Sequence, residues 1–186
     1  SMLYSHGLFR PLFDTPTVRD RSLSTLTCGS AYMVRAEHIR QSGGWNDHFK
    51  TDTWRNAEFS MRLFRLGQRC ELSPEPAIEF NSTQIIRSTD PNYYFDSYLF
   101  TAIHRPTSAV ANLKYKILNP LHCWLNVAVG SGDRNKGFGD YKNAGISQAA
   151  QAKPGKPYSY SALQILATVN KERAVMELEE KSRTAK

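Results

Sequence analysis

The chain has 186 residues, a formal net charge of +7 and a hydrophobic fraction of 40%. A hydrophobic fraction of this size excludes a wholly disordered chain, and the length favours a single domain. No run of about 18 apolar residues occurs, so the sequence encodes no membrane-spanning helix. Because no signal peptide is visible either, we expect the chain to be cytoplasmic or peripheral at a membrane.

The basic excess lies in the second part of the chain. Residues 1–100 carry 11 basic and 11 acidic side chains, whereas residues 101–186 carry 13 and 6. A basic surface attracts nucleic acid, anionic membranes or phosphorylated substrates. Aromatic side chains are interleaved with the basic ones, which is typical of proteins that stack on single-stranded bases. The second part is therefore either an ordinary solvated surface or a polyanion-binding module.

Motifs of several enzyme classes are absent from the sequence. It contains no Walker loop, no G-x-G-x-x-G and no G-x-S-x-G nucleophile elbow. No two histidines are four residues apart, which argues against a helical zinc site. The three cysteines, Cys28, Cys70 and Cys123, are too sparse for a disulfide framework, so we expect them to be small buried side chains.

The hydrophobic pattern predicts short strands alternating with helices. In chain order the expected elements are an irregular lead-in (1–25), a strand (26–34), a helix (36–41), a loop (43–55), a helix (56–66), strands (69–72 and 77–80), helices (91–104 and 108–118), a long loop (130–160) and a C-terminal helix (161–180). Asn56 is the expected N-cap of the second helix, and Gly67 its stop. Phe59 and Leu63 form its apolar face, so Arg62 should point to solvent.

The segment from Thr27 to Phe80 carries the informative pattern. Its parts are, in order, Gly29, Arg35, Gly43-Gly44-Trp45-Asn46, Arg55-Asn56-Ala57-Glu58, Arg62, Gly67 and Pro74. This order resembles the acceptor-side half of a GT-A glycosyltransferase of the family 2 type, over roughly residues 23–90. Trp54, Asn56, Glu58, Ser60 and Arg62 also match parts of a helix-opening motif of the polypeptide N-acetylgalactosaminyltransferases.

The resemblance implies an α/β fold, namely a GT-A-like half-domain (a nucleotide-diphospho-sugar transferase) at 1–105, followed by a basic extension of helices and loops at 106–186. It implies a transferase that moves a sugar from a nucleotide-diphosphate donor to a carbohydrate, lipid or protein acceptor. The motif defines neither the donor sugar, nor the acceptor, nor the stereochemistry.

The resemblance also assigns catalytic candidates. An inverting transferase needs a carboxylate to deprotonate the acceptor hydroxyl, and a helix N-terminus keeps such a carboxylate ionised. Asn56 stands where inverting relatives carry this Asp, and an amide cannot accept the proton. Glu58 and Asp52 are the nearest carboxylates that can replace it. The N-acetylgalactosaminyltransferases also carry Asn here, so Asn56 is compatible with an active enzyme.

Substrate-binding candidates surround these residues. Trp45 and Trp54 offer flat apolar faces to a sugar ring. Arginine is suited to diphosphate oxygens. The remaining candidates are Arg55, Arg62, Gln84 and Arg87. The last two belong to Gln84-Ile85-Ile86-Arg87, a partial match to the Q-x-x-R-W motif of processive synthases.

The resemblance implies Mn²⁺ or Mg²⁺ together with the nucleotide-diphosphate sugar, but the metal motif is missing. No D-x-D occurs, and Phe80 aligns with the position of a metal-binding His. We therefore expect no metal ligands in this chain. The departures leave two further hypotheses open besides the polyanion-binding module: a part of a longer enzyme, and a catalytically inactive glycosyltransferase-like domain.

Residues 91–104 allow two interpretations. Tyr93-Tyr94-Phe95-Asp96 through to Arg105 could form an aromatic flap over an active site. Alternatively, the i, i+4 pattern predicts a helix that buries Tyr94, Tyr98 and Leu99.

Overall fold

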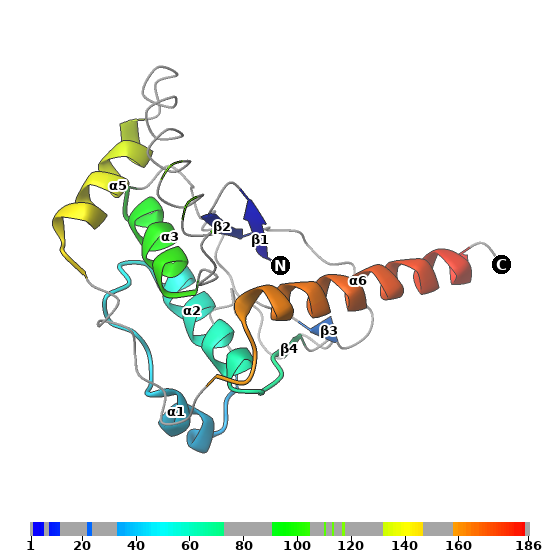
Figure 1. Cartoon of the computed structure of the whole chain (residues 1–186). Helices are drawn as coiled ribbons and strands as arrows, with labels where there is room; N and C mark the ends of the chain where they lie inside the picture. Colours follow the sequence, from blue (N-terminus) through cyan, green and yellow to red (C-terminus); the bar gives the residue numbers. More distant parts are fainter. Residues whose placement is uncertain are drawn as a thin grey trace, which may run out of the picture.

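The computed structural model describes residues 2–5, 8–11, 22–23, 33–72, 91–104, 110, 113, 117, 132–146 and 158–184. The helices are α1 (Ala36–Ser42), α2 (Asp52–Arg65), α3 (Pro91–His104), α5 (Gly132–Asn143) and α6 (Ala162–Thr184) (Figure 1). The strands are β1 (Met2–Ser5), β2 (Leu8–Pro11), β3 (Ser22–Leu23) and β4 (Glu71–Leu72).

The predicted α/β GT-A-like fold is wrong for the described residues, which are mainly helical. The strands form two separate antiparallel pairs, β1 with β2 and β3 with β4, and no parallel sheet runs through the described part. A short apolar run can be a buried strand or part of a buried helix, and periodicity alone does not separate the two. The expected strands at 26–34 and 77–80 lie outside the described residues or largely so.

Helices α2, α3 and α6 surround the main described core. Its buried side chains are Phe49, Trp54, Ala57, Met61, Phe64, Tyr93, Phe95, Leu99, Phe100, Ile103, Ala162, Ile165, Leu166 and Val169. The aromatic share of this core is large, and aromatic rings bury more apolar area per residue than other side chains. Figure 1 shows α5 lying along α3, on the side away from α6.

Helix α2 begins four residues before the predicted start. Its N-cap is Thr51, so Asn56 lies inside the helix and does not cap it. The predicted stop is confirmed, since Gly67 has φ 87° and its N–H donates to the carbonyl of Phe64 at 2.9 Å. The predicted exposure of Arg62 is wrong, because its side chain is fully buried. The reason is a buried acidic partner one turn earlier, described below.

Elements in the second part agree only partly with the sequence. The helices at 91–104 and at the C-terminus are confirmed, and the latter begins with a capping box in which Ser161 N donates to Gln164 Oε1 at 2.8 Å. Tyr98 and Leu99 are buried and Tyr94 is half-buried, so α3 is a core helix. The predicted loop at 130–160 is wrong at α5, where packing on α3 outweighs the poor helix propensity of glycine.

Two further predictions concern the ends of these regions. The lead-in at 1–25 is not wholly irregular, because β1 and β2 form a ladder from Met2↔Pro11 to Ser5↔Leu8. The expected helix at 108–118 lies largely outside the described residues.

Candidate functional site

The loop between α1 and α2 places Trp45 against α2. Gly43 and Gly44 adopt φ values of 82° and 76°, which side chains disfavour, and they turn the chain back after α1. The indole of Trp45 then stacks on Phe59, with ring centroids 4.8 Å apart and an interplanar angle of 22°. Because Trp45 is only half-buried, part of its indole remains accessible.

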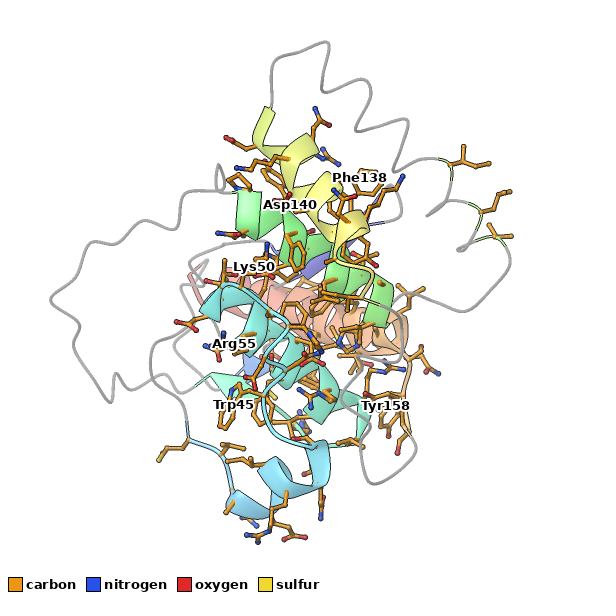
Figure 2. All side chains as sticks on the ribbon, turned by 90° about the vertical axis from the view of Figure 1, so that its left-hand side faces the viewer. Trp45, Lys50, Arg55, Phe138, Asp140 and Tyr158 are labelled. Atoms are coloured by element: carbon orange, nitrogen blue, oxygen red, sulfur yellow. The ribbon has the colours of Figure 1, made fainter. Side chains whose placement is uncertain are left out.

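Three polar side chains continue this surface. Asp52, Arg55 and Asn56 stand at positions i, i+3 and i+4 of α2, and Phe59 at i+7 lies under the indole, so the four share one helix stripe. The side chain of Asp52 is 86% exposed and that of Arg55 is 32% exposed. Figure 2 shows Trp45 and Arg55 on the same side of the molecule. Trp45, Asp52, Arg55 and Asn56 are termed the Trp45 face.

The guanidinium of Arg55 is held in place on this face. Its Nη1 donates to Asp52 Oδ1 at 2.9 Å, and its Nη2 donates to the carbonyl of Phe49 at 3.1 Å. Its Nε is shielded and has no acceptor among the described residues, as is also true of Asn46 Nδ2 and Trp54 Nε1. Native proteins rarely leave buried donors unpaired. The segment from 46 to 55 therefore offers more N–H donors than the described residues satisfy.

A buried carboxylate on α3 anchors the loop before α2. Asp96 Oδ1 accepts from Lys50 N at 2.9 Å, and its Oδ2 accepts from the backbone N and from Oγ1 of Thr51, each at 2.7 Å. Burial raises the pKa of Asp96 to about 6, although these donors and the charge of Lys50 oppose the rise. Asp96 thus fixes the point at which α2 starts and, through it, the position of the Trp45 face.

Glu58 and Arg62 form a buried ion pair inside α2. Glu58 Oε1 accepts from Arg62 Nε at 3.0 Å and its Oε2 accepts from Arg62 Nη2 at 2.5 Å, while Arg62 Nη1 donates to the carbonyl of Ser42 at 2.6 Å. Burial alone would raise the pKa of Glu58, but His104 and Arg62 hold this pKa below its ordinary value. The carboxylate therefore stays ionised although it is only 1% exposed, and it holds Arg62 in the position from which Arg62 joins α2 to α1.

His104 extends this cluster to α3. Its Nδ1 lies 3.1 Å from Arg65 Nη1, and because a guanidinium only donates, Nδ1 is the acceptor and Nε2 carries the proton. Nε2 points toward Glu58 Oε1 at 3.5 Å, and it has no hydrogen-bond acceptor in the described part. Burial holds the pKa of His104 below its ordinary value, although Glu58 opposes this. The imidazole is therefore neutral at pH 7.

The structure divides the predicted site residues into three groups. Those brought together at the surface are Trp45, Asp52, Arg55 and Asn56. Those in the interior are Trp54, Glu58 and Arg62, which are at most 1% exposed. The ring of Trp54 packs against Tyr93 and Phe100, with centroids 5.5 and 5.2 Å away. Gln84 and Arg87 lie outside the described residues.

Sequence reasoning did not identify Asp96 and His104 as residues that hold α2 in position. Both sit within an otherwise apolar, aromatic helix pattern, where an ionisable side chain is unusual. A buried ionisable group requires partners, so this contrast was a usable signal. Their partners at 50–51 and 58–65 lie far away in the sequence, and no local pattern pointed to them.

The comparisons with known proteins give no relative for this chain: no family model, no curated protein and no solved structure matches it. None of the helices that the structure describes is long and apolar enough to cross a membrane. Within the described ranges, no three His, Cys, Asp or Glu side chains are grouped so that they could hold a metal ion.

Proposed function

We propose that the chain is a glycosyltransferase, or part of one, that transfers a sugar from a nucleotide-diphosphate donor to an acceptor hydroxyl. The observation that carries this proposal is the Trp45 face. It combines an accessible indole, a carboxylate, a fixed guanidinium and an amide on one stripe of α2. Sugar recognition requires a flat apolar surface beside polar groups that both donate and accept hydrogen bonds.

Each side chain of the face has a role in this proposal. Trp45 contacts the apolar side of a sugar ring. Asp52 lies in the first turn of α2, and it accepts the proton of the acceptor hydroxyl. Arg55 contacts the oxygens of the diphosphate leaving group, and Asn56 a sugar hydroxyl.

The buried residues hold this face in position. Glu58 and Arg62 link α2 to α1, and Asp96 anchors the loop before α2. Glu58 has no exposed oxygen to offer a substrate, so Asp52 takes the role of base in our proposal. The proposal assigns no residue to a metal ion, since no group of metal ligands occurs in the part of the chain that the structure describes.

Apart from Tyr160, which is 51% exposed, the described aromatic residues of the second part give the polyanion-binding alternative no specific support. Phe138 and Tyr141 pack on Tyr98, with centroids 4.8 and 6.1 Å away. The ring of Tyr158 lies under Arg65 at 3.7 Å. These rings pack against other side chains of the protein, so less of each ring is accessible for stacking on a nucleic-acid base.

A thermal-shift panel of nucleotide-diphosphate sugars tests the proposal, each measured with and without Mn²⁺. We expect one uridine or guanosine diphosphate sugar to raise the melting temperature, since a ligand that binds only the native state stabilises it. Arg55→Ala should remove this rise, whereas Arg40→Ala, which alters an exposed arginine of α1, should retain it. Absence of a rise with every donor would contradict the proposal.

A further inference from the structure

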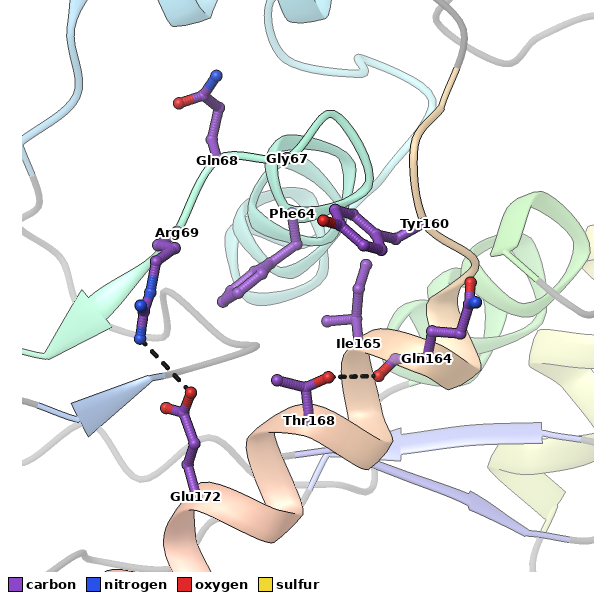
Figure 3. Close-up of a pocket in the computed structure, with 9 residues that line it drawn as sticks. All are labelled: Phe64, Gly67, Gln68, Arg69, Tyr160, Gln164, Ile165, Thr168 and Glu172. Carbon is purple, nitrogen blue, oxygen red and sulfur yellow. Dashed lines mark hydrogen bonds and ion pairs between the residues drawn. The ribbon is translucent and has the colours of Figure 1, made fainter.

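A hollow lies at the C-terminal end of α2, away from the Trp45 face. It has a volume of about 320 Å³ and lies between the C-terminal turn of α2, the Gly67 turn and the first turns of α6 (Figure 3). Arg55 and Gly67 are twelve residues apart, which corresponds to ~18 Å along a helix. The hollow is therefore separate from the Trp45 face.

The floor of the hollow is apolar and one wall is aromatic. Phe64 and Ile165 are 8% and 5% exposed, and they form the floor. Tyr160 stands at one end and is 51% exposed, so a large part of its ring faces solvent. Its backbone is fixed, because Tyr160 N and Ser159 N both donate to the carbonyl of Arg65, at 3.3 and 2.7 Å. These bonds fix the point from which the ring extends beside the hollow.

The opposite end of the hollow carries two charges that neutralise one another. Arg69 Nη2 lies 3.5 Å from Glu172 Oε1, and the side chains are 63% and 40% exposed. An ion pair this exposed and this long contributes little to stability, so a ligand can insert between its members at small cost. A hydroxyl group both donates and accepts hydrogen bonds, and the pair presents carboxylate oxygens and N–H donors for these two bonds at the same edge.

We propose that this hollow binds one ring of a neutral saccharide. The apolar face of the ring would lie on Tyr160, and adjacent hydroxyls would bridge Arg69 and Glu172. A phosphorylated or acidic ligand would find the charge of Arg69 already compensated, whereas a neutral polyol matches a net-neutral edge. The hydroxyl of Thr168, which donates to the carbonyl of Gln164 at 3.0 Å, retains acceptor capacity between the two ends.

The inference rests on the proposed function only for its biological meaning, which is that the hollow would hold an acceptor chain at a distance from the Trp45 face. The binding itself rests on the hollow alone. Glucose, N-acetylglucosamine and glucuronate are the probes, each titrated into the full chain and followed by saturation-transfer NMR. We expect glucose or N-acetylglucosamine to bind, and glucuronate to bind no more tightly than glucose.

Variants assign any binding to the hollow. Tyr160→Ala should weaken saccharide binding about tenfold through the loss of the ring platform. Thr168→Phe places a ring inside the hollow from an exposed helix position and should abolish binding, whereas Ala167→Phe, on the same helix but outside the lining, should not. The Thr168 variant keeps the test valid if the Tyr160 variant folds poorly.

Three outcomes overturn the inference: no binding of either neutral sugar at millimolar concentration, tighter binding of glucuronate than of glucose, or binding that survives Thr168→Phe but disappears in Trp45→Ala. The last result would leave the proposed function standing, because the sugar would then bind at the Trp45 face. Conversely, loss of nucleotide-sugar binding with retained saccharide binding would overturn the proposed function alone.

Discussion

Replacement of Gly137 by alanine tests the packing of α5 on α3. A Cβ at this position would lie 2.5 Å from the carbonyl oxygen of Pro91, 2.7 Å from Tyr94 Cβ and 2.9 Å from Phe95 N. Two of these atoms are backbone, so a change of rotamer cannot relieve the contact. At Gly139, two residues later on the same helix, a Cβ would meet nothing within 4 Å.

The two glycines therefore predict opposite effects on stability. Alanine favours a helix over glycine by about 1 kcal/mol, which is the expected gain for Gly139→Ala. At Gly137 the same gain is outweighed by overpacking, which costs about 3 kcal/mol at the upper end of its usual range because the backbones must separate. We expect a net loss of about 2 kcal/mol for Gly137→Ala and hence a difference of about 3 kcal/mol between the variants.

Urea denaturation and thermal melting measure this difference. For a chain of this length, about 3 kcal/mol corresponds to a separation of roughly 6–12 °C in melting temperature. The near-ultraviolet circular dichroism of Gly137→Ala should also change, because Phe138 and Tyr141 pack on Tyr98 through this interface. A Gly137→Ala variant as stable as Gly139→Ala would refute the placement of α5 on α3.

Three further predictions concern buried ionisable groups. The pKa of Asp96 is about 6 in the folded chain and 3.8 in the unfolded chain, so its contribution to stability is complete below pH 4 and is lost as the pH rises through 6. In urea titrations, the stability of the native chain relative to Asp96→Asn should therefore fall by about 3 kcal/mol over that interval. A stability difference that does not change with pH would be incompatible with this pKa. Glu58→Gln leaves Arg62 buried without its counter-charge and should lower the free energy of unfolding, measured in urea, by about 3–5 kcal/mol. Asp52→Asn breaks the exposed pair with Arg55 and should lower it by at most about 1 kcal/mol. Similar losses of stability for both variants would be inconsistent with the burial of Glu58. Burial raises the pKa of Cys70 to about 12, so iodoacetamide at pH 8 should modify this thiol far more slowly in the native chain than in urea. Peptide mass spectrometry measures both rates, and equal rates would argue against the burial of Cys70.

The sequence predicted the elements whose signals are local. Gly67 ends α2 as predicted, because it has positive φ, and the helices predicted at 91–104 and at the C-terminus are α3 and α6. The start of α2 was missed, because the donors at Lys50 and Thr51 are satisfied by Asp96, 45 residues away. Local pattern cannot reveal a cap supplied by another helix.

The predicted fold failed for a related reason. Helix α5 was predicted as a loop because its glycines lower helix propensity, yet Gly137 is what allows close approach to α3. In the candidate site, the sequence singled out Asp52, Arg55 and Asn56 but placed the first two in a loop, and it predicted the wrong environment for the buried side of α2. Arg62 is charged, and its burial depends on Glu58, Ser42 and the packing of whole helices.

The most direct test of the proposed function is the release of nucleoside diphosphate from nucleotide sugars by the full chain. Release should be measured with and without Mn²⁺ or Mg²⁺, in the presence and absence of saccharide acceptors. We predict release from at least one donor, stimulated by an acceptor and reduced at least about tenfold in Asp52→Asn and in Arg55→Ala. No release from any donor, or release unchanged in both variants, would contradict the account.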